Sequence, residues 1–182
     1  TSHTINDYMA QTRCATAEQT QQLNRQVTDM AKAEGLEYHL DKAIVSNSFR
    51  AHVLLHFAKK HGKQDAAKEL LFKAYFTESK NTDDLSVLKS IVSELALDEQ
   101  QFEQIIIDGS LNDEVKLDLH EARQIGVSGV PFFVYDRKYA FSGAQPIEVF
   151  NEMGEIIVQF FGKRKPGIPE LEDWRTLINK FS

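Results

Sequence analysis

The chain has 182 residues, 42% of them hydrophobic, so its length fits a single soluble domain with a core of ordinary size. Its 27 acidic and 21 basic side chains give a net charge of -6, which argues against nucleic acid or an anionic membrane as the main partner. No apolar run approaches the ~20 residues that a membrane-spanning helix needs. A single cysteine, Cys14, excludes a disulfide within the chain and fits a reducing, cytoplasmic compartment.

Residues 1–125 show the periodicity of consecutive helices. Thr16 and Gln19 form the pattern of a capping box, and Gly35 is suited to end the helix that follows. We expect Leu23, Val27 and Met30 to share one face of this helix. A second helix, apolar on more than one face, is predicted from residues 46–47 to residues 61–62. Four more are predicted from apolar residues at helical spacing: Ala67–Ala74, Leu85–Leu95, Phe102–Ile106 and Val115–Ala122.

After residue 125 the pattern changes to that of strands. Phe132–Tyr135 and Tyr139–Ser142 flank a polar stretch of hairpin length, residues 136–138. Pro146 is suited to the first turn of a helix that runs to about Met153. Because a two-stranded hairpin is marginal alone in water, these strands need sheet partners, and the sequence before residue 126 predicts none.

The last segment, residues 154–182, is predicted to be a C-terminal extension. The run Ile156–Phe161 is either an added strand or a continuation of the preceding helix. A basic linker then leads to a helix with one apolar stripe that contains Trp174. We expect this tail to dock on its own domain or on a second subunit, because the mixed charge of its polar face does not favour a membrane.

The stretch Gly126-Val-Ser-Gly-Val-Pro-Phe-Phe-Val134 joins the last predicted helix to the hairpin, and Ser142-Gly-Ala-Gln-Pro146 follows the hairpin. A cis bond is expected at Val130-Pro131, since only a tertiary amide makes the cis form accessible at low cost. Alone, Pro131 also fits a turn proline at a strand start. Together, these residues resemble the cis-proline loop and closing hairpin of DsbA-like thioredoxin-fold proteins. They look most like the FrnE-type branch, described as dithiol-disulfide isomerases linked to polyketide biosynthesis.

The resemblance implies an α/β, thioredoxin-like (DsbA-like) fold with a large all-helical insertion. Residues 1–125 would form the insertion, a lid domain over the active site. Residues 126–153 would form the C-terminal part of the thioredoxin-like domain. The family's N-terminal strand-helix-strand unit, which carries a Cys-x-x-Cys motif, is not found in this sequence, so the resemblance covers residues 1–153 and begins part-way into the family pattern.

The resemblance also assigns roles to the proline loop. In the family this loop faces the redox cysteines, keeps metal from the thiols and pairs with substrate backbone by strand addition. Carried over residue by residue, the catalytic roles fall on Val130 and Pro131. Ser128 and Gly129 complete the loop and are expected to contact substrate.

Asn47, Phe49 and His52 resemble an Asn-Ser-Phe-x-Ala-His stretch at the family's lid helix. The resemblance implies that Asn47 and His52 lie near substrate, where a cationic His52 lowers the pKa of a nearby thiol. Taken without the resemblance, Asn47 is the N-cap of its helix, worth about 1 kcal/mol, and His52 is a partly buried helix residue. Both interpretations stay open.

Two further candidates are weighed on their spacing. His52 and His56 stand four residues apart, as in a two-histidine metal site, but no third ligand is evident and we expect no metal and no cofactor. Cys14 has no cysteine near it. Although Arg13 beside it favours a thiolate, a lone cysteine of this kind is typically an inert small hydrophobe that at most forms a mixed disulfide.

Three functions are therefore considered. The first is a FrnE-type thiol-disulfide oxidoreductase or isomerase whose redox pair lies outside the given sequence. Its partner would be a cysteine-containing peptide or protein, or glutathione. The second is a redox-silent peptide-binding or assembly module, with a homo-oligomer completing the sheet. The third is a glutathione-linked relative of kappa-class transferases and 2-hydroxychromene-2-carboxylate isomerases, in which a serine replaces the first cysteine.

Overall fold

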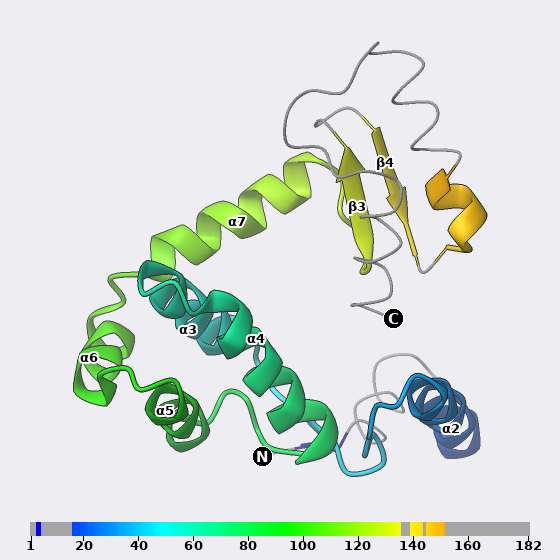
Figure 1. The fold of residues 1–182 in the computed structure, drawn as a ribbon, viewed down its shortest axis with the longest axis horizontal. Helices are drawn as coiled ribbons and strands as arrows, with labels where there is room; N and C mark the ends of the chain where they lie inside the picture. The colour runs from blue at the N-terminus through cyan, green and yellow to red at the C-terminus, as the bar shows by residue number, and fades with distance from the viewer. Residues whose placement is uncertain (1–2, 5–15, 136–138, 144, 152–182) are drawn as a thin grey trace. The chain divides into compact units, whose positions relative to one another are not determined.

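The computed structural model describes residues 3–4, 16–135, 139–143 and 145–151. The chain divides into two compact units, Thr1–Leu119 and His120–Ser182, which we describe separately (Figure 1). Cys14, the hairpin turn 136–138 and the whole extension 154–182, with its run Ile156–Phe161, lie outside the described residues. The predicted boundary after residue 125 stays a prediction. Among the described helices, none is long and apolar enough to cross a membrane.

The first unit is built mainly of helices, and a small sheet joins its two short strands. Strand β1 pairs antiparallel with β2, and α4 continues directly into a π-helical turn, η1. The last helix, α7, continues for five residues into the second unit. The elements are β1 His3–Thr4, α2 Ala17–Ala33, β2 Ile44–Val45, α3 Phe49–Lys60, α4 Gln64–Phe72, η1 Lys73–Thr77, α5 Leu85–Glu94, α6 Glu99–Asp108 and α7 Asn112–Gln124.

The helices begin and end where local signals predict. Thr16 accepts a hydrogen bond from the Gln19 backbone N–H at 3.2 Å, and the Gln19 side chain accepts one from the Thr16 N–H at 2.9 Å, which completes the capping box. Asp98 caps α6 by accepting from two backbone N–H groups. Gly109 ends α6 in the left-handed region, where a residue without a Cβ is favoured.

The core of the first unit lies between α3, α4, α5 and α6. Helix α3 buries residues on several faces, as its sequence predicts, and the rings of Phe57 and Phe102 lie 5.5 Å apart at the centre of this core. Leu54, Leu88 and Val92 are fully buried around them. Burial of this many large apolar side chains is the main source of stability for such a unit.

Two features of the first unit differ from the sequence-based expectation. The pairing of β1 with β2 was not predicted, because two-residue strands are too short to show an alternating pattern. The predicted helix through Ala74 widens into η1. In α2, Leu23, Val27 and Met30 lie at the spacing of one helix face, as expected, and this face is exposed in the described structure.

The second unit holds the predicted hairpin with the predicted bounds, β3 Phe132–Tyr135 and β4 Tyr139–Ser142. The strands pair antiparallel, with Phe132 opposite Ser142. Residues 147–151 are helical, and within this helix Phe150 places its ring edge-on to that of Phe133, at 4.9 Å. From residue 120 onwards, no residue whose burial is described is buried.

Candidate functional site

The proline loop begins at a well-defined helix end. Gly126, at φ 83°, donates to the Arg123 carbonyl at 3.1 Å, and Val127 donates to the Ala122 carbonyl at 2.9 Å. This pair of hydrogen bonds is the Schellman motif, in which the left-handed residue is usually glycine. The motif reverses the chain at the end of α7 and directs it towards residues 128–131.

The loop itself is open to solvent. Ser128, Gly129, Val130 and Pro131 are all exposed, and Val130 is exposed over 88% of its surface. The Val130–Pro131 peptide bond is cis. Val130 forms no backbone hydrogen bond to any other residue that the structure describes. Within the described part of the chain, the N–H and C=O of Val130 are thus left to water or to an added chain.

Pro131 joins this loop to the hairpin. Its carbonyl accepts a hydrogen bond from the Gly143 N–H at 2.9 Å, one residue beyond the β3–β4 ladder. Gly143 adopts φ 89°, a conformation that favours glycine. The hairpin thus fixes one end of the loop, and the Schellman motif of α7 fixes the other.

Asn47 lies before α3 in the first unit and makes a capping contact. Its Oδ1 accepts a hydrogen bond from the Phe49 N–H at 2.9 Å, while the residue between them, Ser48, makes no side-chain cap. This contact satisfies one of the free N–H groups at the helix start. The structural role considered for Asn47 is therefore present, and its role towards substrate stays a prediction.

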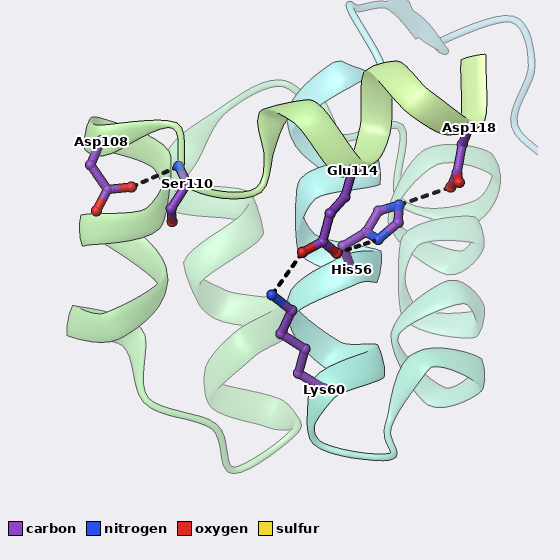
Figure 2. Close-up of polar contacts among 6 residues, drawn as sticks. All are labelled: His56, Lys60, Asp108, Ser110, Glu114 and Asp118. Atoms are coloured by element: carbon purple, nitrogen blue, oxygen red, sulfur yellow. Dashed lines mark hydrogen bonds and ion pairs between the residues drawn. The ribbon is translucent and has the colours of Figure 1, made fainter. Parts of the chain in front are cut away.

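The two histidines of α3 differ in environment. His52 is exposed, whereas His56, one turn later, is 8% exposed. The ring of His56 lies between two carboxylates of α7, as Figure 2 shows: Nδ1 is 3.1 Å from Oε2 of Glu114, and Nε2 is 2.9 Å from Oδ2 of Asp118. The two histidines therefore do not act as a matched pair in the structure.

Lys60 completes this polar cluster. Its Nζ donates to the other carboxylate oxygen of Glu114 at 2.8 Å (Figure 2). That hydrogen bond, followed by the charges of Lys60 and His56, holds the pKa of Glu114 below its usual value. No group of three or more metal-ligating side chains suited to a metal ion occurs among the described residues.

This cluster was not predicted from the sequence, although a signal for it is present there. His56 and Lys60 are four residues apart on α3, and Glu114 and Asp118 are four residues apart on α7, so each pair shares one helix face. Two basic and two acidic side chains at matching spacing are typical of a contact between neighbouring helices. What the sequence does not reveal is that these two helices are neighbours.

Comparisons with known proteins identify the family and the fold of the chain. The model of the DSBA-like thioredoxin domain matches residues 3–153, which include both the helical unit and the proline loop. The crystal structure of a probable DsbA oxidoreductase from Streptomyces coelicolor is 31% identical in sequence, with a TM-score of 0.79. The similarity covers 93% of this chain and 72% of that one. No curated protein sequence matches the chain.

The family model matches most of the chain. The related structure also shares 31% of its sequence with this chain, so the likeness extends beyond the fold. The fold is the α/β thioredoxin-like fold with a helical insertion, as the sequence predicts. This protein belongs to the DSBA-like thioredoxin-domain family.

Proposed function

We propose that this chain is the substrate-binding part of a thiol-disulfide oxidoreductase or isomerase of the FrnE type. The observation that carries the proposal is the family match over residues 3–153, which takes in the proline loop at Val130 and Pro131. The exposed backbone of Val130, which bonds to no other described residue, supports it, because such a group can add one strand of substrate by main-chain hydrogen bonds.

The reaction requires two thiols, and these 182 residues contain one cysteine. In the proposed reaction, the thiolate of a first cysteine attacks a sulfur of the substrate disulfide, and the other substrate sulfur leaves as a thiolate. A second cysteine thiolate then attacks the mixed disulfide, which releases the reduced substrate and leaves an enzyme disulfide. The proposal places this cysteine pair outside the given residues and assigns backbone recognition to residues 128–131.

A peptide-binding experiment tests the recognition half of the proposal. A short extended peptide containing one cysteine is titrated against the chain, and backbone amide shifts are followed by NMR. We expect shifts centred on residues 128–132. N-methylation of the peptide residue that pairs with the loop should weaken binding by about fivefold to tenfold, since it removes a main-chain hydrogen bond.

The Val130→Ala variant is the matched control for this experiment. Because the proposed contact uses the backbone, the variant should bind the unmodified peptide within about threefold of the parent and keep the sensitivity to N-methylation. Equal binding of methylated and unmodified peptides, or shifts confined to other regions, would contradict the proposal.

A second candidate, a redox-silent peptide-binding module, is favoured by the single cysteine of the sequence. A disulfide-exchange assay on the native protein, isolated from its source, distinguishes the two functions. We expect it to reduce or reshuffle disulfides of a model substrate and to form a mixed disulfide that alkylation and mass spectrometry detect. Peptide binding without disulfide exchange would select the module, and glutathione conjugation would select the glutathione-linked class.

A further inference from the structure

His56 is held in an arrangement that depends on its protonation. Both of its ring nitrogens lie within hydrogen-bonding distance of carboxylates on the same helix, at 3.1 Å from Glu114 and 2.9 Å from Asp118 (Figure 2). Its side chain is 10% exposed. A neutral imidazole carries a proton on one nitrogen only, whereas an imidazolium donates from both. Only the imidazolium therefore makes two hydrogen bonds to two ionised carboxylates in this geometry.

Loss of the proton turns one contact from attractive to repulsive. The ring nitrogen that loses its hydrogen presents a lone pair to a carboxylate oxygen, which also offers only lone pairs. The other charged group at the cluster is Lys60 of α3, and it bonds the opposite oxygen of Glu114 at 2.8 Å. Lys60 does not contact Asp118 in the structure, so it does not compensate for the second carboxylate.

Among the described residues, α7 makes few other contacts that would hold it on the first unit. Val115 is the one buried residue of this helix, whereas Leu117 and Leu119 are exposed. A packed helix normally presents an apolar stripe of about three to four residues in every two turns. His56 contacts Glu114 in the first turn of α7 and Asp118 one turn later. These two contacts therefore span the part of α7 that packs on α3.

We propose that His56 is a proton-dependent clasp, whose imidazolium holds the first half of α7 on α3 and whose deprotonation releases it. Because only the protonated ring bonds both carboxylates, the clasp opens as the pH rises and the second ring proton is lost. The chain runs from α7 into the loop at residues 126–131, so release also frees the segment that leads to the loop. The clasp is independent of the proposed catalytic function.

Hydrogen exchange of the full chain tests the clasp directly. The exchange rates of the α7 and α5 amides are measured in the same sample from about pH 5.5 to about pH 8.5 and corrected for intrinsic rates. The readout is the ratio of the α7 rate to the α5 rate. We expect α7 opening to increase about tenfold relative to α5, the size expected when a charge-assisted hydrogen bond is lost. In the closed state, the nitrogen-15 signals of His56 should show a proton on both ring nitrogens.

Three variants separate the clasp from a purely structural contact. Asp118→Asn supplies an amide that accepts from the imidazolium and donates to the neutral imidazole, so α7 should stay docked and its pH response should disappear. His56→Gln should also remove the response. His52→Gln changes the exposed histidine one turn earlier and should retain the parent's response in full.

The outcomes are distinct. A ratio of α7 to α5 exchange that stays constant with pH in the parent overturns the proposal. So does a full pH response in Asp118→Asn, or a His52→Gln variant that loses the response. If His56→Gln fails to fold, Asp118→Asn still decides the matter, because Asp118 is 67% exposed and its replacement leaves the core intact.

Discussion

In the first unit, α3 buries Leu54 and Phe57 completely between three other helices, whereas in the second unit the hairpin buries none of its described side chains. The helical unit therefore contains the apolar core that a folded domain requires. A ring contact between Phe133 and Phe150 joins the hairpin to the helix that follows it, and a two-stranded sheet is marginal alone. The comparison predicts that the first unit is stabilised mainly by its own buried core, whereas the described part of the second unit holds no comparable core.

The largest effect is expected in the helical core. Phe57→Ala removes a ring that is 1% exposed and contacts Phe102, so it should lower the free energy of unfolding of the first unit by about 3–5 kcal/mol. Urea denaturation measures this change. Ile107→Ala, at an exposed position of α6, should change it by less than about 0.5 kcal/mol. A small effect of Phe57→Ala would contradict the prediction that this unit is stabilised mainly by its own buried core.

The turn between α6 and α7 gives a smaller but more specific effect. A Cβ at Gly109 would lie 2.6 Å from the Asn112 Nδ2 atom, and φ is 69°. Gly109→Ala should therefore destabilise the first unit by about 1–2 kcal/mol. Gly62→Ala is the matched control, because Gly62 has φ 67° but a Cβ added there would have no neighbouring atom within 4 Å. Equal losses in the two variants would show that backbone strain alone decides the result.

In the second unit the ring pair is the contact to test. A double-mutant cycle of Phe133→Ala and Phe150→Ala should give a coupling of about 0.5–1.5 kcal/mol, the range for edge-to-face aromatic pairs. Hydrogen exchange of the β3 and β4 amides measures it. The α3 amides should be unchanged in all three variants. Faster exchange in α3 would show that the two units unfold together.

One substitution should stabilise the helical unit. Ala96 ends α5 with φ 50° in a Schellman motif, in which Leu97 donates to the Val92 carbonyl at 3.0 Å. Glycine fits this conformation without the steric cost that a Cβ brings. Ala96→Gly should raise the free energy of unfolding by roughly 0.5–1 kcal/mol, after the entropy cost of glycine in the unfolded chain. Thermal denaturation with the parent alongside measures the shift, and a lower Tm would contradict this account of the strain.

The smallest effect concerns acid stability. The hydrogen bond from Lys60 lowers the pKa of Glu114 in the folded state. The ionised Glu114 therefore stabilises the folded state above its ordinary pKa of 4.5, and this stabilisation is lost as the pH falls through the lower folded pKa. The stability difference between the parent and Lys60→Met should be largest at neutral pH and shrink below 4.5. Lys59→Met, at an exposed neighbouring position, should show no such trend. If the stability difference between the parent and Lys60→Met stays constant with pH, the effect comes from packing of the Lys60 side chain and not from its hydrogen bond to Glu114.

The fold was predictable wherever the signal is local. The capping box of Thr16 and Gln19, the cap at Asp98 and the glycine ends at Gly35 and Gly109 each depend on residues within one turn, and all four are confirmed. The resemblance of the loop sequence then gave the thioredoxin-like fold, because the helical and strand patterns occur in the family's order. The cis bond between Val130 and Pro131 is also a local feature, because it depends on the proline that follows Val130.

Long-range contacts were not predictable in this way. His56 meets Glu114 and Asp118 across 58 and 62 residues, and nothing in the spacing of one helix specifies which other helix it faces. The pairing of β1 with β2 likewise joins distant segments through two residues on each side, too few for a pattern. Which of the predicted residues contact substrate also depends on the placement of the two units. The substrate contacts expected of Asn47 and His52 therefore stay predictions.

The segment between α2 and α3 shows what such long-range contacts mean for the order of folding. His39 donates its backbone N–H to the Phe76 carbonyl at 2.7 Å and places Nδ1 2.7 Å from the Thr77 carbonyl, while Thr77 donates its hydroxyl to the Glu37 carbonyl at 2.8 Å. These contacts satisfy the last carbonyls of η1 from a segment about 40 residues earlier. Closing so long a loop has an entropy cost that neighbouring helices avoid. We therefore expect α3 to α6 to assemble first, with residues 37–39 joining η1 as a late event.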